Sequence, residues 1–220
     1  MFNIFPLSTI FWIHLISYMA LGLCFEIPEQ SLNAFCLWCA RNKERFRQRI
    51  STVRKILKVR YVLTHVVAPV TGIVAIVSGI ELTARGGYSF AEGWLFWMLC
   101  AASLGIYKGI YQHNSYIRKL LVLSRAHDDE GRERFRRGIL SPFDQPLIML
   151  ELPTYIFNFW TASVKPVWWL PCPGIIAGIE HFGSPWLAGI VIVLAGSLWL
   201  IPLNYGMRRY SVVFKDKERF

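Results

Sequence analysis

Three polar side chains stand inside apolar stretches of this chain, where each is placed to do chemistry. His65, Lys108 and Glu151 each lie about five residues inside the basic end of an apolar block, roughly 7 Å deep at 1.5 Å per helical residue. An ionisable group inside a membrane is costly and needs a partner or a task. The shared depth predicts that acid, base and imidazole meet and hold or move a proton. Alternatively, Lys108 snorkels to the headgroups and Glu151 bonds to a neighbouring helix.

The histidines offer a second kind of chemistry. His14 lies near the middle of the first apolar block, and His65 and His113 lie closer to the ends of two others. Neutral imidazole ligates the iron of b-type haem in helical bundles, whose apolar interior accepts the porphyrin. All three are therefore candidate ligands of haem iron, with His14 pairing with His65 or His113. A membrane histidine also serves as a hydrogen-bonded packing residue, and that interpretation stays open.

Cys36 and Cys39 form a CxxC pair beside the first basic segment. Such a pair binds metal or exchanges disulfides, but a zinc site needs further ligands and the chain has no second pair. Chance occurrence is the simpler interpretation in a reducing cytoplasm, and a redox or metal role stays open.

The elements that must position these residues are apolar blocks of about 20 residues, long enough to cross roughly 30 Å of hydrocarbon. The chain has 220 residues, of which 54% are hydrophobic and 17% are charged. We predict transmembrane helices at Phe5–Cys24, Tyr61–Thr83, Gly93–His113, Pro146–Val164 and Pro185–Tyr205. The fourth contains Glu151 and Asn158, so a re-entrant or interfacial segment is the alternative there.

Basic residues gather in three segments, Arg41–Arg60, Arg118–Arg137 and Arg208–Arg219. The positive-inside rule places all three in the cytoplasm. Two crossings must then separate the second segment from the third, which favours Pro146–Val164 as a true span. The amino terminus would lie outside and the carboxyl terminus inside. Because topology accounts for the net charge of +10, that charge does not indicate nucleic-acid binding.

The first basic segment has an apolar repeat. Phe46, Ile50, Val53 and Leu57 recur at helical spacing among arginines. We expect an amphipathic helix lying on anionic headgroups. The predicted fold is thus an all-α integral membrane bundle of about five transmembrane helices, with an interfacial amphipathic helix in the first cytoplasmic loop.

Small residues mark one face of the second and third spans. Ala68, Gly72, Ala75 and Gly79 are spaced three or four apart, and the third span has a similar series. Such faces let helices approach closely, which predicts that these two spans form the centre of the bundle. Glycine is also tolerated generally in membrane helices, so the alternative is that these small residues do not mark a packing face.

Two stretches resemble HemJ-type protoporphyrinogen oxidases, which are small membrane haem proteins of bacteria. One is Glu151-Leu152-Pro153-Thr154 followed by Val164-Lys165-Pro166, similar to the closing helix of that family. The other is Arg60-Tyr61 leading to Pro69 and Gly79, similar to its second helix. His14 in the first helix and Trp94 at the start of the third also match. The chain differs from the family at Leu150 and Lys108, where the family has asparagine and histidine.

The resemblance implies a bacterial inner-membrane protein in which residues 1–166 form about four helices around haem b, with a basic cytoplasmic linker. Residues 167–220 would add an outer loop rich in Trp, Pro and Gly, a further transmembrane helix and a basic tail. It also implies oxidation of protoporphyrinogen, with His14, Arg60 and Glu151 as matching positions. Arg60 and Lys108 would face propionates or substrate carboxylates, and Glu151 would relay protons.

The functional expectation is therefore a b-type haem protein that acts in porphyrin oxidation or electron transfer. As an enzyme, it would be an oxidoreductase of the protoporphyrinogen-oxidase type. The alternative is a non-enzymatic accessory or assembly subunit of a larger membrane complex, favoured by an aromatic-rich surface with nine Trp in the chain. A transporter is a weaker third reading, because no inverted repeat is visible.

Overall fold

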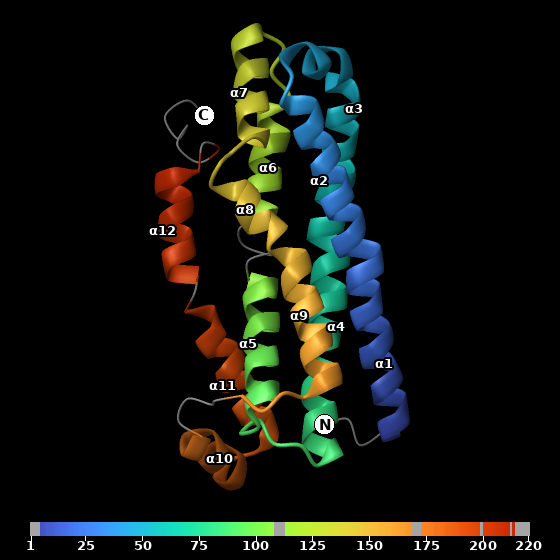
Figure 1. Ribbon diagram of the computed structural model, residues 1–220, viewed down its shortest axis with the longest axis vertical. Coiled ribbons are helices and arrows are strands. Elements are labelled where there is room, and N and C mark those ends of the chain that lie inside the picture. The colour runs from blue at the N-terminus through green and yellow to red at the C-terminus, as the bar shows by residue number, and fades with distance from the viewer. Residues whose placement is uncertain (1–4, 108–112, 169–172, 199, 212, 214–220) are drawn as a thin grey trace.

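The computed structural model is all-α and describes residues 5–107, 113–168, 173–198, 200–211 and 213. Two long helical rods run side by side along the molecule (Figure 1). The first consists of α1 (Leu7–Ala20), a π-helical turn (Leu21–Glu26) and α2 (Ile27–Ala40). The second consists of α3 (Lys43–Val62), a π-helical turn (Leu63–Val67) and α4 (Ala68–Gly86).

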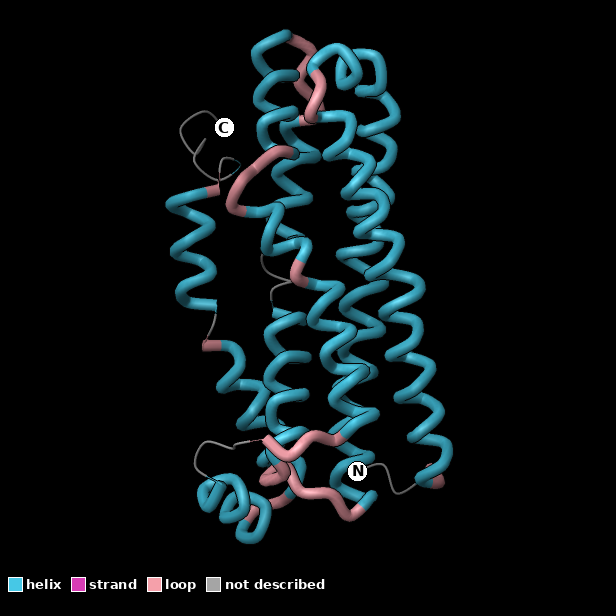
Figure 2. The backbone as a smooth tube through the Cα atoms, viewed as in Figure 1, coloured by secondary structure: helices cyan, strands magenta, loops and turns pink. Residues whose placement is uncertain are grey.

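The other helices pack around these rods and are joined by loops, most of which lie at the two ends of the bundle (Figure 2). In chain order they are α5 (Gly93–Tyr107), α6 (Asn114–Leu123), α7 (Asp129–Ile139), α8 (Asp144–Met149), α9 (Glu151–Val164), α10 (Pro173–Phe182), α11 (Pro185–Ser197) and α12 (Leu200–Tyr210). One end of the bundle contains α2, α3, α6 and α7, and the other contains α1, α4, α5, α9 and α11 (Figure 1).

The two ends of the bundle differ in what they expose. Around α1, α4 and α9 the exposed side chains are apolar, as at Trp12, Val70 and Ile156. Around α3 and α7 they are charged, as at Arg47 and Arg137. A surface of apolar side chains is stable against lipid, whereas a charged surface requires water. We call these parts the membrane half and the charged half.

Within the part of the chain that the structure describes, three helices are long and apolar enough to cross a membrane, namely Leu7–Ala40, Lys43–Gly86 and Pro185–Tyr210. They overlap three of the predicted spans and indicate a multi-pass membrane protein that contacts the lipid bilayer. A shorter apolar helix covers Gly93–Ser103 within a fourth predicted span. The prediction of an all-α fold with several membrane-crossing helices is confirmed at this level.

The structure differs from the predicted interfacial helix in the first basic segment. Helix α3 is continuous with α4 over 44 residues, so it stands upright on the second span instead of lying flat. Its apolar face is buried against protein: Phe46 and Phe135 of α7 have ring centroids 5.5 Å apart, and Val53 and Leu57 belong to the same core. An amphipathic pattern specifies only that one face is covered, and here α2, α6 and α7 cover it instead of lipid.

Capping residues determine where several of these helices begin and end. The Asn42 side chain accepts a hydrogen bond from the Arg45 backbone N–H at 3.0 Å, which caps α3 after the tight turn from α2. The Asp128 side chain caps α7 in the same way through the Gly131 N–H at 3.2 Å. At the far end, Gly87 ends α4 in the left-handed conformation that glycine adopts without strain.

Candidate functional site

Among the described residues, four charged side chains form a buried cluster where the membrane half meets the charged half. Glu29 comes from the first turn of α2, Arg60 from the end of α3, His113 from the position before α6, and Glu151 from the start of α9. All four residues are at most 4% exposed. We call them the junction cluster.

The junction cluster is held by short contacts. Arg60 donates from Nε to Glu29 Oε1 at 2.8 Å and approaches the same oxygen with Nη2 at 2.6 Å. His113 Nε2 lies 2.8 Å from Glu29 Oε1, and its Nδ1 lies 3.1 Å from both carboxylate oxygens of Glu151. An ionised carboxylate only accepts hydrogen bonds, so both imidazole nitrogens must carry a proton. With His113 as an imidazolium, the described members of the cluster carry two negative and two positive charges, which suits their burial.

The helices bend to meet at this cluster. The two π-helical turns, Leu21–Glu26 and Leu63–Val67, pack against each other beside it. A π turn inserts one residue into a helix and changes which face the following residues present, and such turns occur often at functional sites. One turn precedes Glu29 and the other follows Arg60. The two turns therefore help to orient the helix faces that carry these two side chains toward each other.

Sequence reasoning named three of the four members. Arg60, His113 and Glu151 were predicted site residues, and the structure brings them together. Glu29 was missed because it follows the predicted end of the first span and was assigned to the linker. Its position one residue after Pro28, just beyond an apolar block, was the available signal. Lys108 lies outside the described residues.

His65 lies apart from these contacts. Its Nδ1 is 2.9 Å from the Tyr61 carbonyl oxygen and 3.1 Å from Thr64 Oγ1, both on its own rod. Its ring stacks on Tyr61 with centroids 3.8 Å apart. Its Nε2 is buried without a hydrogen bond to the described residues, and His65 is not among the residues that line the cavity described next.

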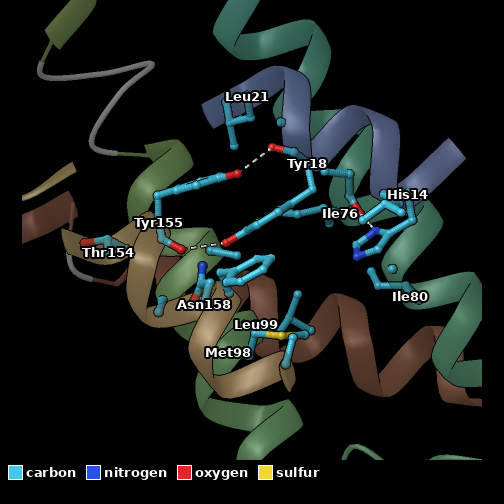
Figure 3. A pocket seen from close by; sticks show the side chains of 18 of the residues that line it. His14, Tyr18, Leu21, Ile76, Ile80, Met98, Leu99, Thr154, Tyr155 and Asn158 are labelled. Carbon is cyan, nitrogen blue, oxygen red and sulfur yellow. Dashed lines mark hydrogen bonds between the residues drawn. The ribbon is translucent and has the colours of Figure 1, made fainter. Parts of the chain in front are cut away.

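A cavity of about 370 Å³ lies between α1, α4, α5 and α9 in the membrane half (Figure 3). Apolar side chains form most of its wall. The small-residue face of α4, with Gly72, Ala75 and Gly79, also lines it. The small residues of α4 were expected to face α5, the third predicted span, but this face packs mainly against α1 and leaves space for the cavity.

His14 projects from α1 into the wall of this cavity (Figure 3). Its Nδ1 lies 2.9 Å from the Ala75 carbonyl oxygen and 3.3 Å from Ser78 Oγ. A carbonyl only accepts, so Nδ1 carries the proton and Nε2 retains the lone pair. A Cβ at Gly79 would stand 3.0 Å from His14 Cε1, so glycine there makes room for the imidazole.

Two tyrosines join α1 to α9 next to His14. The rings of Tyr18 and Tyr155 stack with centroids 4.6 Å apart. Each hydroxyl donates to the backbone carbonyl of the other residue, at 2.7 Å from Tyr18 and 3.2 Å from Tyr155 (Figure 3). The pair fixes the separation of the two helices between the cavity and the junction cluster.

The cavity and the junction cluster share Glu151. Its carboxylate contacts His113, and the same residue lines the cavity. A proton on His113 is thus one hydrogen bond from a side chain of the cavity wall. Neither depth nor spacing in the sequence could have shown this connection.

The expected haem can be tested against these side chains. His14 offers a free Nε2 on an apolar wall, which suits one axial ligand. His113 has both nitrogens engaged by carboxylates, and His65 does not line the cavity, so neither supplies a second ligand here. Arg60 is paired with Glu29 and does not face the cavity. Of the three predicted ligands, His14 alone therefore offers a nitrogen at the cavity wall.

The CxxC pair is enclosed in protein. Cys36 and Cys39 are free thiols and essentially unexposed in the core of the charged half. Over the described part of the chain, no group of three or more His, Cys, Asp or Glu side chains is arranged to hold a metal ion. In this structure the two thiols act as core residues.

Comparison with known proteins gives no relative: no family model, no curated protein and no solved structure matches the chain.

Proposed function

We propose that this chain is a five-span membrane protein that binds b-type haem in the cavity through His14 and acts in porphyrin oxidation or electron transfer. The observation that carries the proposal is His14 itself. Its Nδ1 is tied to the Ala75 carbonyl, which leaves Nε2 as a lone pair at an apolar cavity. The HemJ-like stretches around Arg60 and Glu151 support the same reading, as does the position of both residues in one cluster.

Five crossings agree with the arrangement of the membrane half. Helices α5 and α9 lie beside α1 and α4 (Figure 1), although they have only 15 and 14 residues. At 1.5 Å per residue each spans about 20 Å, and neighbouring turns and loops supply the rest. With the basic segments gathered at one end, and only Arg85 and Lys165 described at the other, the amino terminus lies outside and the carboxyl terminus in the cytoplasm of a bacterial cell.

Each protein group then has a separate role. A bound haem would supply one-electron chemistry, and His14 would hold it. Glu151 would exchange a proton with the occupant of the cavity and pass it to or from His113, its hydrogen-bond partner at 3.1 Å. Arg60 neutralises the charge of Glu29, the second carboxylate that contacts His113. The Glu29 carboxylate can therefore stay ionised although it is buried.

The first experiment is a reduced-minus-oxidised visible spectrum of the protein purified in detergent, with a pyridine haemochrome assay for stoichiometry. We expect a Soret band, about one haem per chain, and loss of haem in His14→Ala. His65→Ala is the matched control and should keep its haem, because His65 does not line the cavity. A colourless folded protein that co-purifies with a stoichiometric partner would contradict the proposal and favour an accessory subunit.

A further inference from the structure

Asn158 brings to the cavity wall a polar atom that has no hydrogen-bond partner among the described residues. Asn158, on α9, is 5% exposed and lines the cavity, and its Oδ1 has no hydrogen bond among the described residues. Figure 3 shows it across the cavity from His14, beside the ring of Tyr18. Buried polar atoms are nearly always paired, so an orphaned acceptor that faces a cavity indicates a donor brought by a bound molecule.

The neighbouring donors are already used. Every hydroxyl that lines the cavity donates to a backbone carbonyl, and these hydroxyls belong to Tyr18, Thr83, Thr154, Tyr155 and Ser163. His14 Nδ1 is engaged by Ala75 in the same manner. A rotation of Asn158 alone would not obtain a donor from these groups. A bound ligand can supply the missing N–H or O–H.

The rim of the cavity shows from where that ligand enters. Phe11 of α1 and Phe159 of α9 line the cavity and are 49% and 51% exposed. Ala162 and Ser163, on the same stretch of α9, are also exposed and also line it. In the membrane half an exposed side chain faces lipid. The cavity therefore opens toward the bilayer between α1 and α9, and its occupant is lipid-soluble.

We infer that the cavity takes from the bilayer a lipid-soluble aromatic ring bearing a hydroxyl group, of the hydroquinone class, which donates to Asn158. Aromatic side chains on several walls suit a flat ring, namely Phe11, Tyr18, Phe25, Phe90, Tyr155 and Phe159. The choice of a hydroquinone over other phenols rests on the proposed redox function. The aromatic ring and its hydroxyl group are inferred from the residues of the cavity wall alone. Asn158 is the residue that recognises the hydroxyl.

Binding can be measured with trimethylhydroquinone, added under anaerobic conditions to the full-length protein in lipid nanodiscs and followed by tryptophan fluorescence quenching. Its dimethyl ether is the matched ligand, because it keeps the ring and lacks the donors. We expect the hydroquinone to bind at least about tenfold more tightly than the ether, the ratio that one buried hydrogen bond of about 1.4 kcal/mol provides. Asn158→Leu, which keeps the volume, should remove that ratio.

Two further variants test the place and the entrance. Thr161→Val removes another buried hydroxyl of α9 that lacks a partner but does not line the cavity, so binding should not change. Ala162→Trp adds a ring to the exposed rim and should slow or block binding without disturbing the core. Equal binding of hydroquinone and ether, or an unchanged ratio in Asn158→Leu, would overturn the inference.

The haem proposal and this inference fail separately. Haem and the hydroquinone would occupy the same cavity, so the ligand ratio is measured in haem-free His14→Ala protein. His14→Ala should lose haem and keep the hydroquinone-to-ether ratio, adding Asn158→Leu to it should remove the ratio, and Asn158→Leu alone should keep haem. A haem-free protein that still discriminates the two ligands would reject the proposed function alone. If His14→Ala also abolished discrimination, the hydroxyl would be recognised by the group at His14, and Asn158 would be the wrong residue.

Discussion

Both carboxylate oxygens of Glu151 lie 3.1 Å from Nδ1 of His113, although the two residues come from different helices. Glu151 opens α9 and His113 immediately precedes α6, so this contact ties a membrane helix to the charged half. Because Glu151 also lines the cavity, the protonation of His113 and the occupancy of the cavity are physically connected. Stability and ligand binding should therefore both respond to changes at these two residues.

Removing the imidazole should strongly destabilise the fold. His113→Phe keeps a ring but leaves the carboxylates of Glu29 and Glu151 without the cation between them. Breaking a buried ionic cluster by deleting one partner costs about 3–5 kcal/mol. Thermal unfolding in detergent should show a large drop in midpoint. His65→Phe, which replaces a half-buried histidine with local contacts, should have a clearly smaller effect, and equal effects would contradict the cluster.

The sequence placed Glu151 near the level of the junction cluster but did not identify its partner. His65 was predicted to meet Glu151, whereas Glu151 contacts His113, and on the rod of His65 it is Arg60 that joins the cluster, through Glu29. Five residues along an α-helix change the height by about 7.5 Å and turn the side chain by about 140°. Span ends are uncertain by several residues, so depth counting cannot choose between these two positions.

The upright charged half was also beyond sequence reasoning. The apolar face of α3 must be buried, and from the sequence a membrane surface could bury it as well as α6 and α7 do. The apolar blocks were easier to find, because the thickness of a bilayer sets their length independently of tertiary contacts. For the same reason Glu29, which lies beyond a block, was found only from the folded chain.

Gly22 should not accept even a methyl group. A Cβ there would overlap the hydroxyl of Tyr155 and stand 2.8 Å from its Cε1, in the stacked pair that joins α1 to α9. Gly22→Ala should lower stability by about 1–3 kcal/mol, the usual cost of overpacking. Gly178→Ala in α10 is the control, since no atom lies within 4 Å of its added Cβ. It should be neutral or stabilising by about 0.5–1 kcal/mol, and similar losses in both variants would refute the tyrosine contact.

Acid should weaken α7 through Glu133. Hydrogen bonds from Arg136, at 2.7 and 2.8 Å, and then from Arg137 lower the pKa of the Glu133 carboxyl from 4.5 to about 2. A depressed pKa gives a stabilisation that is complete above pH 4.5 and is lost as the pH falls toward 2. The unfolding midpoint should therefore fall less between pH 6 and pH 3 in Glu133→Gln than in the parent protein. Glu130→Gln, on the same helix, should retain the parent's dependence.

The upright position of α3 can be tested by cysteine labelling in a background without the native cysteines. Gln48 is exposed and Val53 is buried in the core of the charged half. Gln48→Cys should react with a membrane-impermeant maleimide only from the cytoplasmic side, and Tyr88→Cys, on the loop after α4, only from outside. Val53→Cys should react from neither side and should be inaccessible to quenchers dissolved in lipid. If a lipid-dissolved quencher reached a label at Val53, α3 would lie on the membrane surface after all.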